Sequence, residues 1–172
     1  MLQNIILTGF MGTGKTTVGR ILAAKLGRPF LDVDELIVEM EGKEIPTIFS
    51  ESGEEYFRQL ETRAISQAIS GEVKVISTGG GALLTPKNRE MMQAGGFLLC
   101  LTASATEIIN RLGQGKGRPL LQGENALSKV RELLKERSPL YAEVLHKIST
   151  DGKKPQKIVQ EILLLLQEEG LI

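Results

Sequence analysis

The chain has 172 residues, and its 21 Lys and Arg side chains balance 21 Asp and Glu side chains. This length is enough for one domain, or one domain with a small insertion, around a substantial core. The zero net charge gives no indication of a nucleic-acid or anionic-membrane partner, so any ligand must be recognised locally. No apolar run approaches ~18 residues and no signal-peptide pattern opens the chain, so we expect a soluble, cytoplasmic protein. We separately expect it to be a monomer.

Short apolar runs alternate along the chain with longer segments of helical periodicity. The apolar runs predict strands at residues 4–8, 30–33, 73–77, 97–102 and 147–150. The periodic segments predict helices at residues 15–26, 34–41, 53–70, 86–94, 105–112, 126–144 and 155–169. This alternation predicts an α/β fold, a doubly wound parallel sheet with helices on both faces and ligands beyond the carboxyl ends of its strands. Cys100, the single cysteine, lies in an apolar run and is interpreted as a core residue rather than a reactive thiol.

Residues 9–16 read GFMGTGKT and match GxxxxGK[ST] between a predicted strand and a predicted helix. In that context backbone N–H groups can surround nucleotide phosphates, and the helix N-terminus adds partial positive charge. Lys15 would reach the β and γ phosphates, and the Thr16 hydroxyl would bind Mg2+. A purely structural glycine turn is the alternative. Because GTPases, motor ATPases, small-molecule kinases and nucleotide sensors all carry such a loop, the second substrate must be inferred from other residues.

Two carboxylates, Asp32 and Asp34, follow the second apolar run at a spacing that places both on one side of a strand. Asp32 could hold Mg2+, directly or through water. Asp34 could accept a hydroxyl proton and align that oxygen for attack on the γ phosphorus. The alternative is that Asp34 only caps the following helix.

Two cations are candidates for holding an anionic acceptor. Glu61 lies on the apolar face of the predicted helix at 53–70, with Arg58 at its margin, so the carboxylate could fix the arginine fork toward a substrate carboxylate. A pair that is merely solvated on an exposed helix is equally compatible with the spacing. Arg137 lies near the end of a later helix, where it could turn toward the same site or be an ordinary surface cation.

Two glycine-rich segments require a reason. Gly79, Gly80 and Gly81 follow the third predicted strand, and without Cβ atoms their N–H groups could closely approach a small hydroxylated ligand. A flexible turn is the alternative. The second segment, GQGKGRPLLQG at residues 113–123, has neither helical nor strand period, and we interpret it as a mobile lid over the phosphate site rather than a linker.

Six segments in chain order, GFMGTGKTT, LDVDE, IFSESGEEYFRQLE, STGGGALL, GRPLL and ERSPLY, resemble the shikimate kinase family from end to end. The resemblance implies a P-loop NTPase fold related to nucleoside monophosphate kinases, a three-layer αβα sandwich with a five-stranded parallel sheet. It implies a single domain over residues 1–172, with a lid at about 112–124 and acceptor-binding helices at about 34–62. It also implies that ATP and Mg2+ serve to phosphorylate the 3-hydroxyl of shikimate, in the pathway to chorismate and the aromatic amino acids.

The resemblance further implies roles for individual residues. Shikimate would be held by Asp34, the suspected base, and by Arg58, Gly79, Gly80, Gly81 and Arg137, with Phe49 and Phe57 as walls. The ATP phosphates would contact Gly12, Thr13, Gly14, Lys15, Thr16 and Thr17. Thr16 and Asp32 would serve Mg2+, and Arg118 of the lid would cover the phosphates as a catalytic cation beside Lys15. Adenine would contact Arg111 and Lys153, although the resemblance implies an arginine where this chain has Lys153.

Two other functions remain compatible with the sequence. A kinase acting on gluconate or a nucleoside monophosphate would share the phosphate loop and the fold, and it would differ in the acceptor site. A nucleotide-binding module without catalysis would share them as well. The presence of Lys15, Thr16, Asp32 and Asp34 favours an active enzyme, and two arginines with one aspartate fit a single carboxylate plus hydroxyls better than a phosphate.

Overall fold

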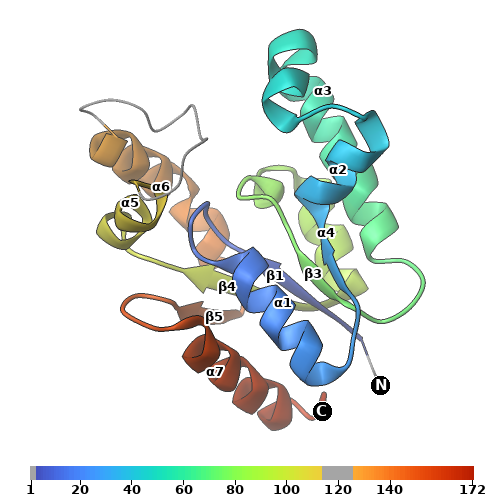
Figure 1. Ribbon diagram of the computed structural model, residues 1–172, viewed down its shortest axis with the longest axis vertical. Helices are drawn as coiled ribbons and strands as arrows, with labels where there is room; N and C mark the ends of the chain where they lie inside the picture. The colour runs from blue at the N-terminus through green and yellow to red at the C-terminus, as the bar shows by residue number, and fades with distance from the viewer. Residues whose placement is uncertain (1–2, 114–125) are drawn as a thin grey trace.

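A computed structural model describes residues 3–113 and 126–172 of the chain (Figure 1). Its strands are β1 (Asn4–Thr8), β2 (Phe30–Asp32), β3 (Val75–Ser77), β4 (Gly96–Thr102) and β5 (His146–Ser149). Its helices are α1 (Lys15–Leu26), α2 (Val33–Glu41), α3 (Ile45–Ala68), α4 (Pro86–Gly95), α5 (Ala105–Gly113), α6 (Ala126–Ala142) and α7 (Pro155–Glu168), with the 3-10 helix η1 (Ala82–Leu84). The predicted lid at 112–124, Arg118 included, lies almost wholly outside the described residues.

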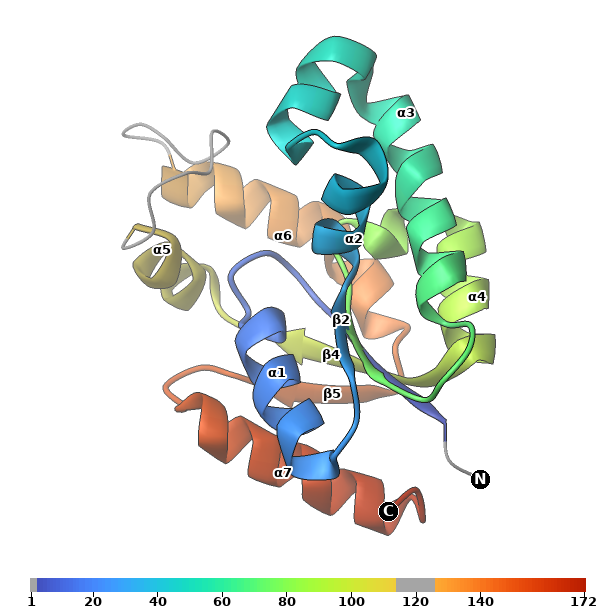
Figure 2. The ribbon, with the colours of Figure 1, turned by 45° about the vertical axis from the view of Figure 1, so that its right-hand side comes forward.

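The five strands form one sheet in the order β2-β3-β1-β4-β5, and every pairing is parallel. Helices α1 and α7 cover one face of the sheet, while α4 and α6 lie on the other (Figures 1 and 2). The predicted three-layer α/β sandwich with a five-stranded parallel sheet is therefore confirmed. Strand β1 is central, so the segment that follows it lies in the middle of the sheet edge where the carboxyl ends of the strands meet.

Alternation along the strands divides the core into two clusters. Ile5 and Leu7 of β1 pack with α1 and α7, whereas Ile6 packs with helices of the opposite layer. Cys100 lies in that second cluster with no exposed surface, which confirms that it is a core residue. Burial raises the pKa of its thiol to about 11, so the thiol stays protonated near neutral pH.

Among residues 3–113 and 126–172, none of the helices combines the length and the apolar character that a membrane span requires.

The largest departure from the predicted elements is at α3. The helical pattern predicts a start at Gly53, but the helical segment begins at Ile45 with Pro46 in its first turn. Gly53 has φ 80° and ψ 175°, so it is a kink between two helical pieces rather than a beginning. Helix α2 and the first piece of α3 rise on one side of the molecule, opposite α5 and the start of α6 (Figure 2).

Candidate active site

The loop after β1 closes on itself and leads directly into α1. Gly14 is the N-cap of α1 with φ 92°, a left-handed conformation that favours glycine. The Thr13 hydroxyl donates to the carbonyl oxygen of Phe10 at 2.8 Å. The nearly buried Lys15 donates through Nζ to the carbonyl oxygens of Gly9 at 2.8 Å and Phe10 at 2.9 Å. An ammonium group and the N-terminus of a helix thus face one small loop, an arrangement suited to phosphate.

Asp32 links this loop to the next helix. Its Oδ2 accepts a hydrogen bond from the Thr16 hydroxyl at 2.8 Å, and its Oδ1 accepts from the Asp34 backbone N–H at 3.0 Å. Asp32 is therefore the N-cap of α2, and the alternative in which Asp34 acts as the cap is wrong. The expectation that both carboxylates extend from one strand is also wrong, because β2 ends at Asp32 and Asp34 lies in the first turn of α2. Thr17 follows Thr16 on the exposed start of α1.

Arg58 and Glu61 of α3 form the predicted ion pair. Arg58 Nη1 lies 2.8 Å from Glu61 Oε2, and Nη2 lies 3.2 Å from Oε1 of Glu54. The Glu61 side chain is 1% exposed and that of Arg58 is 20% exposed, so the alternative of a merely solvated pair is wrong. Within the described residues, Glu61 Oε1 has no hydrogen-bond partner. A buried carboxylate with one unsatisfied oxygen is costly, and such a group requires a functional reason.

Burial raises the pKa of the Glu61 carboxyl, the Arg58 guanidinium opposes that rise, and the charge of Asp34 adds to it. For Arg58, burial alone would lower the pKa, but Glu61 and Glu54 raise it overall. The two shifts conflict for one ion pair: the raised pKa of Arg58 favours the charged pair, whereas the raised pKa of Glu61 opposes it. The difference in burial explains them, since the desolvation cost falls mainly on the almost fully enclosed carboxylate.

The three glycines after β3 lie close to other groups of the site. A Cβ atom at Gly79 would lie 2.9 Å from Asp34 Oδ1 and 3.0 Å from Glu61 Oε1. A Cβ atom at Gly81 would lie 2.7 Å from both Nη atoms of Arg58, and one at Gly80 would lie 2.9 Å from the Met11 backbone nitrogen. Side chains at Gly79 and Gly81 and backbone at Gly80 thus occupy the space that a larger residue would need, so the flexible-turn alternative does not account for these glycines.

Arg137 turns inward from α6 toward this cluster. Its guanidinium carbon lies 5.7 Å from the centre of the Phe10 ring, and its charge lowers the pKa of Glu61. Arg137 therefore belongs to the same electrostatic environment as the Arg58 pair and is not an ordinary surface cation.

The two phenylalanines predicted as walls pack against each other, with ring centres 4.5 Å apart. Phe49 is 37% exposed. The Phe57 ring lies next to Arg58, with 5.3 Å between the guanidinium carbon and the ring centre.

The two residues predicted to contact adenine differ in their surroundings. Arg111 of α5 donates to the Gly12 carbonyl oxygen at 3.3 Å. It also donates to two atoms of Thr150, Oγ1 at 2.9 Å and the carbonyl oxygen at 2.8 Å, and it forms an ion pair with Glu107 at 2.9 Å. It thus joins the phosphate loop to the end of β5. Lys153 instead forms an ion pair with Glu161 of α7, with 2.7 Å between Nζ and Oε2.

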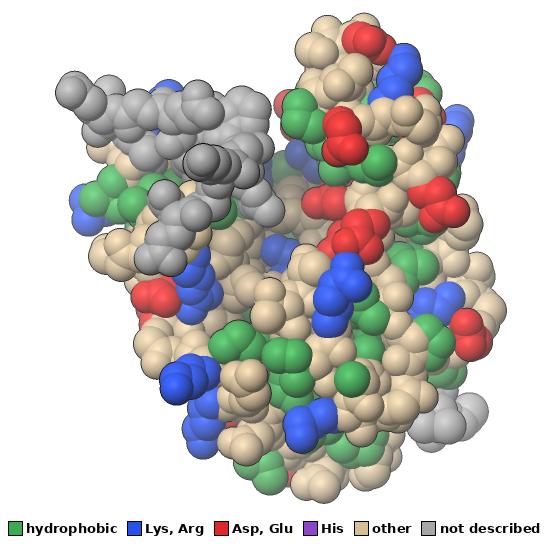
Figure 3. Space-filling view, viewed as in Figure 1, with side chains coloured by type: hydrophobic (Ala, Val, Ile, Leu, Met, Phe, Trp, Pro, Cys, Tyr) green, Lys and Arg blue, Asp and Glu red, His purple; other side chains and the backbone are tan. Residues whose placement is uncertain are grey.

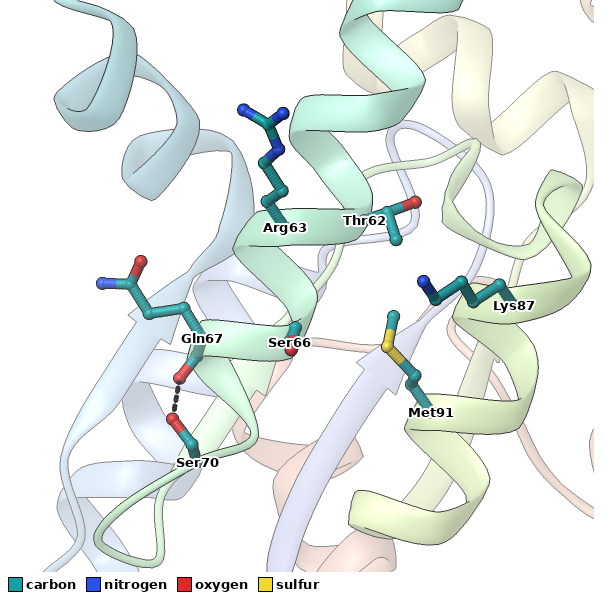
Figure 4. Close-up of a pocket in the computed structure, with 7 residues that line it drawn as sticks. All are labelled: Thr62, Arg63, Ser66, Gln67, Ser70, Lys87 and Met91. Atoms are coloured by element: carbon teal, nitrogen blue, oxygen red, sulfur yellow. Dashed lines mark hydrogen bonds between the residues drawn. The ribbon is translucent and has the colours of Figure 1, made fainter.

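The surface is hollowed between α2–α3 and α5, and acidic side chains line the α2–α3 wall of this hollow (Figure 3). A separate open groove of about 490 Å³ lies between α3 and α4 (Figure 4). Lys87 and Met91 extend from α4 toward α3 there, and Ser70 donates a hydrogen bond to the Gln67 carbonyl oxygen at 2.8 Å. None of the predicted site residues lines that groove, so we do not assign the site to it.

Some polar residues around the site were not predicted. The Tyr141 hydroxyl donates to the carbonyl oxygen of Gly80 at 2.9 Å, and Asn88 donates to the carbonyl oxygen of Ala82 at 3.2 Å. Tyr141 lies four residues after Arg137 in the segment ERSPLY, so helical spacing could have placed both on one face. No comparable sequence signal marks Asn88, because its role depends on how α4 packs against the loop.

Comparisons with known proteins agree with this geometry. The shikimate kinase family profile matches residues 11–167. A shikimate kinase of Symbiobacterium thermophilum is 45% identical over 98% of both chains, and one of Thermodesulfovibrio yellowstonii is 44% identical over 94% of both chains.

Among solved structures, a shikimate kinase from Acinetobacter baumannii in complex with shikimate has a TM-score of 0.93 and 43% identity, covering 100% of this chain and 97% of that one. A gluconokinase from Sinorhizobium meliloti has a TM-score of 0.61 at 18% identity over 96% of this chain and 92% of that one, which shows a shared fold only. This chain therefore belongs to the shikimate kinase family, as the family profile and the relatives matched over nearly their whole length show.

Proposed function

We propose that this protein is an ATP-dependent kinase that transfers the γ-phosphoryl group to the 3-hydroxyl of shikimate, giving shikimate 3-phosphate. The reaction belongs to the pathway to chorismate and the aromatic amino acids. The observation that carries the proposal is that Asp34 and Arg58 both lie against one glycine loop, with the charge of Arg137 acting on the same ion pair, at the sheet edge that also carries the phosphate loop. A homologous enzyme crystallised with shikimate supports the choice of acceptor.

The acceptor side has the charges that one carboxylate with neighbouring hydroxyls requires. Two guanidinium groups can bind a single carboxylate with charge-assisted hydrogen bonds. Glu61 holds Arg58 in place from below, so little side-chain freedom is lost when the ligand binds. Asp34, beside Gly79 on the same side as Glu61, would supply the anionic oxygen that can align a hydroxyl and accept its proton. Phe49 and Phe57 offer apolar surface for a carbon ring.

On the nucleotide side, Lys15 and the amides of residues 12–17 would hold the phosphates and offset the charge that spreads over them during transfer. The residues also fit Mg2+, which commonly binds one or two protein oxygens together with phosphate and water oxygens. Thr16 and Asp32 present two such oxygens 2.8 Å apart. No group of three or more His, Cys, Asp or Glu that could hold a metal occurs in residues 3–113 and 126–172, so the phosphates would have to complete the coordination. Bound there, Mg2+ would neutralise phosphate charge.

The adenine end and the lid complete the proposal. The N–H edges of Arg111 are held by Glu107, Gly12 and Thr150, so this guanidinium would contact a base through its planar face. Lys153 would need to leave Glu161 or contact the base through its alkyl stem. We assign to Arg118 the role of covering the phosphates. Because one chain supplies the residues for both substrates, we also propose that the enzyme acts as a monomer, in the cytoplasm.

A coupled assay against shikimate, gluconate and nucleoside monophosphates in parallel tests the proposed reaction. We expect ATP consumption that depends on shikimate and on Mg2+, with phosphorylation at the 3-hydroxyl shown by NMR of the product. Turnover of gluconate or a nucleoside monophosphate at a higher kcat/KM than shikimate would contradict the proposal. ATP binding without turnover of any of these acceptors would instead indicate a nucleotide-binding module.

Replacing Asp34 with Asn should lower kcat by about 10²- to 10⁴-fold, because the amide cannot accept the hydroxyl proton. Nucleotide affinity, measured by calorimetry, should stay within about twofold, since Asp34 belongs to the acceptor side. Glu35→Gln is the matched control, because Glu35 is the next residue of α2 and pairs with Arg20 at 2.5 Å. Wild-type kcat in the Asp34→Asn enzyme would show that the base assignment is wrong.

Replacing Arg58 with Lys should raise the KM for shikimate by about 10- to 100-fold, with a smaller change in kcat. The charge remains, but the planar fork that can meet a carboxylate with two parallel hydrogen bonds is lost. The exposed Arg63 of the same helix lines none of the proposed site, so Arg63→Lys is the control and its KM should stay at the wild-type value. An unchanged KM in Arg58→Lys would remove Arg58 from the acceptor site.

The raised pKa of Glu61 makes stability depend on pH in a defined direction. The folded chain binds this proton more tightly than the unfolded chain, so the stabilisation is complete below the ordinary value of 4.5 and is lost as pH rises through the folded value. Urea unfolding of wild type and Glu61→Gln should show wild type losing stability relative to the variant as pH rises above about 4.5. Glu55→Gln, an exposed carboxylate on α3, controls for the loss of one charge. A difference that grows in favour of wild type with rising pH would contradict this sign.

A further inference from the structure

Tyr141 connects the helix that carries Arg137 to the glycine loop. This residue of α6 is 7% exposed and belongs to the core cluster, and its hydroxyl donates to the Gly80 carbonyl oxygen at 2.9 Å, across 61 positions of sequence. Burial raises the pKa of this phenol to about 12, although the charge of Arg137 opposes the rise. The hydroxyl therefore keeps its proton at every physiological pH and remains a hydrogen-bond donor.

The acceptor of this bond controls more than one oxygen atom. A trans peptide is planar, so the carbonyl of Gly80 and the N–H of Gly81 lie on opposite edges of one rigid unit. Fixing the direction of the carbonyl therefore fixes the direction of that N–H. Gly81 also lies against the Arg58 guanidinium, because a Cβ atom at Gly81 would be only 2.7 Å from both Nη atoms. The Tyr141 bond thus orients a backbone donor beside the guanidinium group that the proposed substrate carboxylate would meet.

The N–H groups of Gly80 and Gly81 are available for such a role. Within residues 3–113 and 126–172, neither of them donates to a protein acceptor. Backbone donors that lack an internal partner must bind water or a ligand, because leaving them unpaired costs free energy. Two consecutive backbone donors beside the Arg58 guanidinium are suited to an anionic ligand.

The remaining side of the loop is held by α4. Asn88 donates to the Ala82 carbonyl oxygen at 3.2 Å, and Arg89 donates to the Leu83 carbonyl oxygen at 2.7 Å. These two bonds fix η1, the segment that follows the glycines. The Tyr141 bond fixes the preceding peptide, so the loop is held by both α4 and α6.

We propose that Tyr141 is a positioning residue for the acceptor: through the Gly80 carbonyl it holds the Gly80–Gly81 peptide in register with Arg58 and Arg137. This inference rests on the proposed function for the identity of the acceptor. Tyr141 acts through the peptide and does not itself contact the substrate. Arg137 lies one helical turn before it on α6, so the same residue also links the position of the second arginine to that of the loop.

Tyr141→Phe tests the proposal, because it removes the hydroxyl and keeps the buried ring. We expect the KM for shikimate and its calorimetric Kd to rise about 5- to 20-fold, the effect of one lost hydrogen bond. The KM for ATP should stay within about twofold. Tyr56→Phe is the matched control: Tyr56 is the other tyrosine of the chain, its hydroxyl bonds to Glu41 at 3.1 Å, and its shikimate KM should equal that of wild type.

A second measurement does not depend on activity. In enzyme labelled with 15N-glycine, Tyr141→Phe should shift the amide signals of Gly80 and Gly81 and speed their hydrogen exchange, while Gly27, at the far end of α1, should not change. A merely structural role would lower the unfolding midpoint without changing the ratio of the two KM values.

The outcomes separate this inference from the proposed function. If wild type does not bind or phosphorylate shikimate, the proposed function fails, and the glycine amides still report whether Tyr141 orders the loop. If wild type uses shikimate but Tyr141→Phe keeps the wild-type shikimate KM and unshifted glycine amides, the positioning role is overturned. An equal rise in the KM values for shikimate and ATP would also overturn it.

Discussion

The ion pair between Arg58 and the buried Glu61 is the interaction on which the acceptor site depends. A carboxylate that is 1% exposed is stable in its charged form only with close partners, and here one oxygen binds Arg58 at 2.8 Å while the other has none within the described residues. The guanidinium is held by that carboxylate from one side and by the Phe57 ring below it. The result is a cation whose position is already set before any ligand arrives, which lowers the entropy cost of binding.

This fixed pair explains the glycines that follow β3. Gly79 lies where a side chain would meet both Asp34 and Glu61, and Gly81 lies where a side chain would meet the Arg58 fork. The loop can approach this closely only without Cβ atoms, and the approach leaves the Gly81 backbone beside the Arg58 fork. Gly79 and Gly81 are therefore a consequence of the charged cluster as much as a proposed contact for a ligand. The same closeness makes the loop sensitive to how its peptides are oriented, which is why the Tyr141 and Asn88 bonds are informative.

The sequence predicted the fold class, the parallel sheet, the phosphate loop and the Arg58–Glu61 pair, because each of these depends on local spacing and on periodicity. It failed at Asp34, since two carboxylates at i and i+2 suit a strand, yet the side chain of Asp32 caps a helix that begins one residue later. It also missed the first piece of α3, where Pro46 starts a short helix and Gly53 bends the chain after only two turns. Helical spacing from Arg137 places Tyr141 near the site, but the hydrogen bonds of Tyr141 and Asn88 could not be predicted, because their partners are backbone carbonyls 61 and 6 residues away.

The correction at Asp32 changes how the two halves of the site are related. One of its oxygens accepts from Thr16 at the phosphate loop, and the other accepts from the N–H of Asp34. A single carboxylate thus connects the start of α1, the proposed nucleotide side, with the start of α2, which carries the proposed base. Had both aspartates extended from a strand, each would have been placed independently of the other. As an N-cap, Asp32 instead fixes the position of Asp34 relative to Thr16, so in the proposed reaction phosphate binding and alignment of the acceptor oxygen would depend on the same hydrogen-bonded turn.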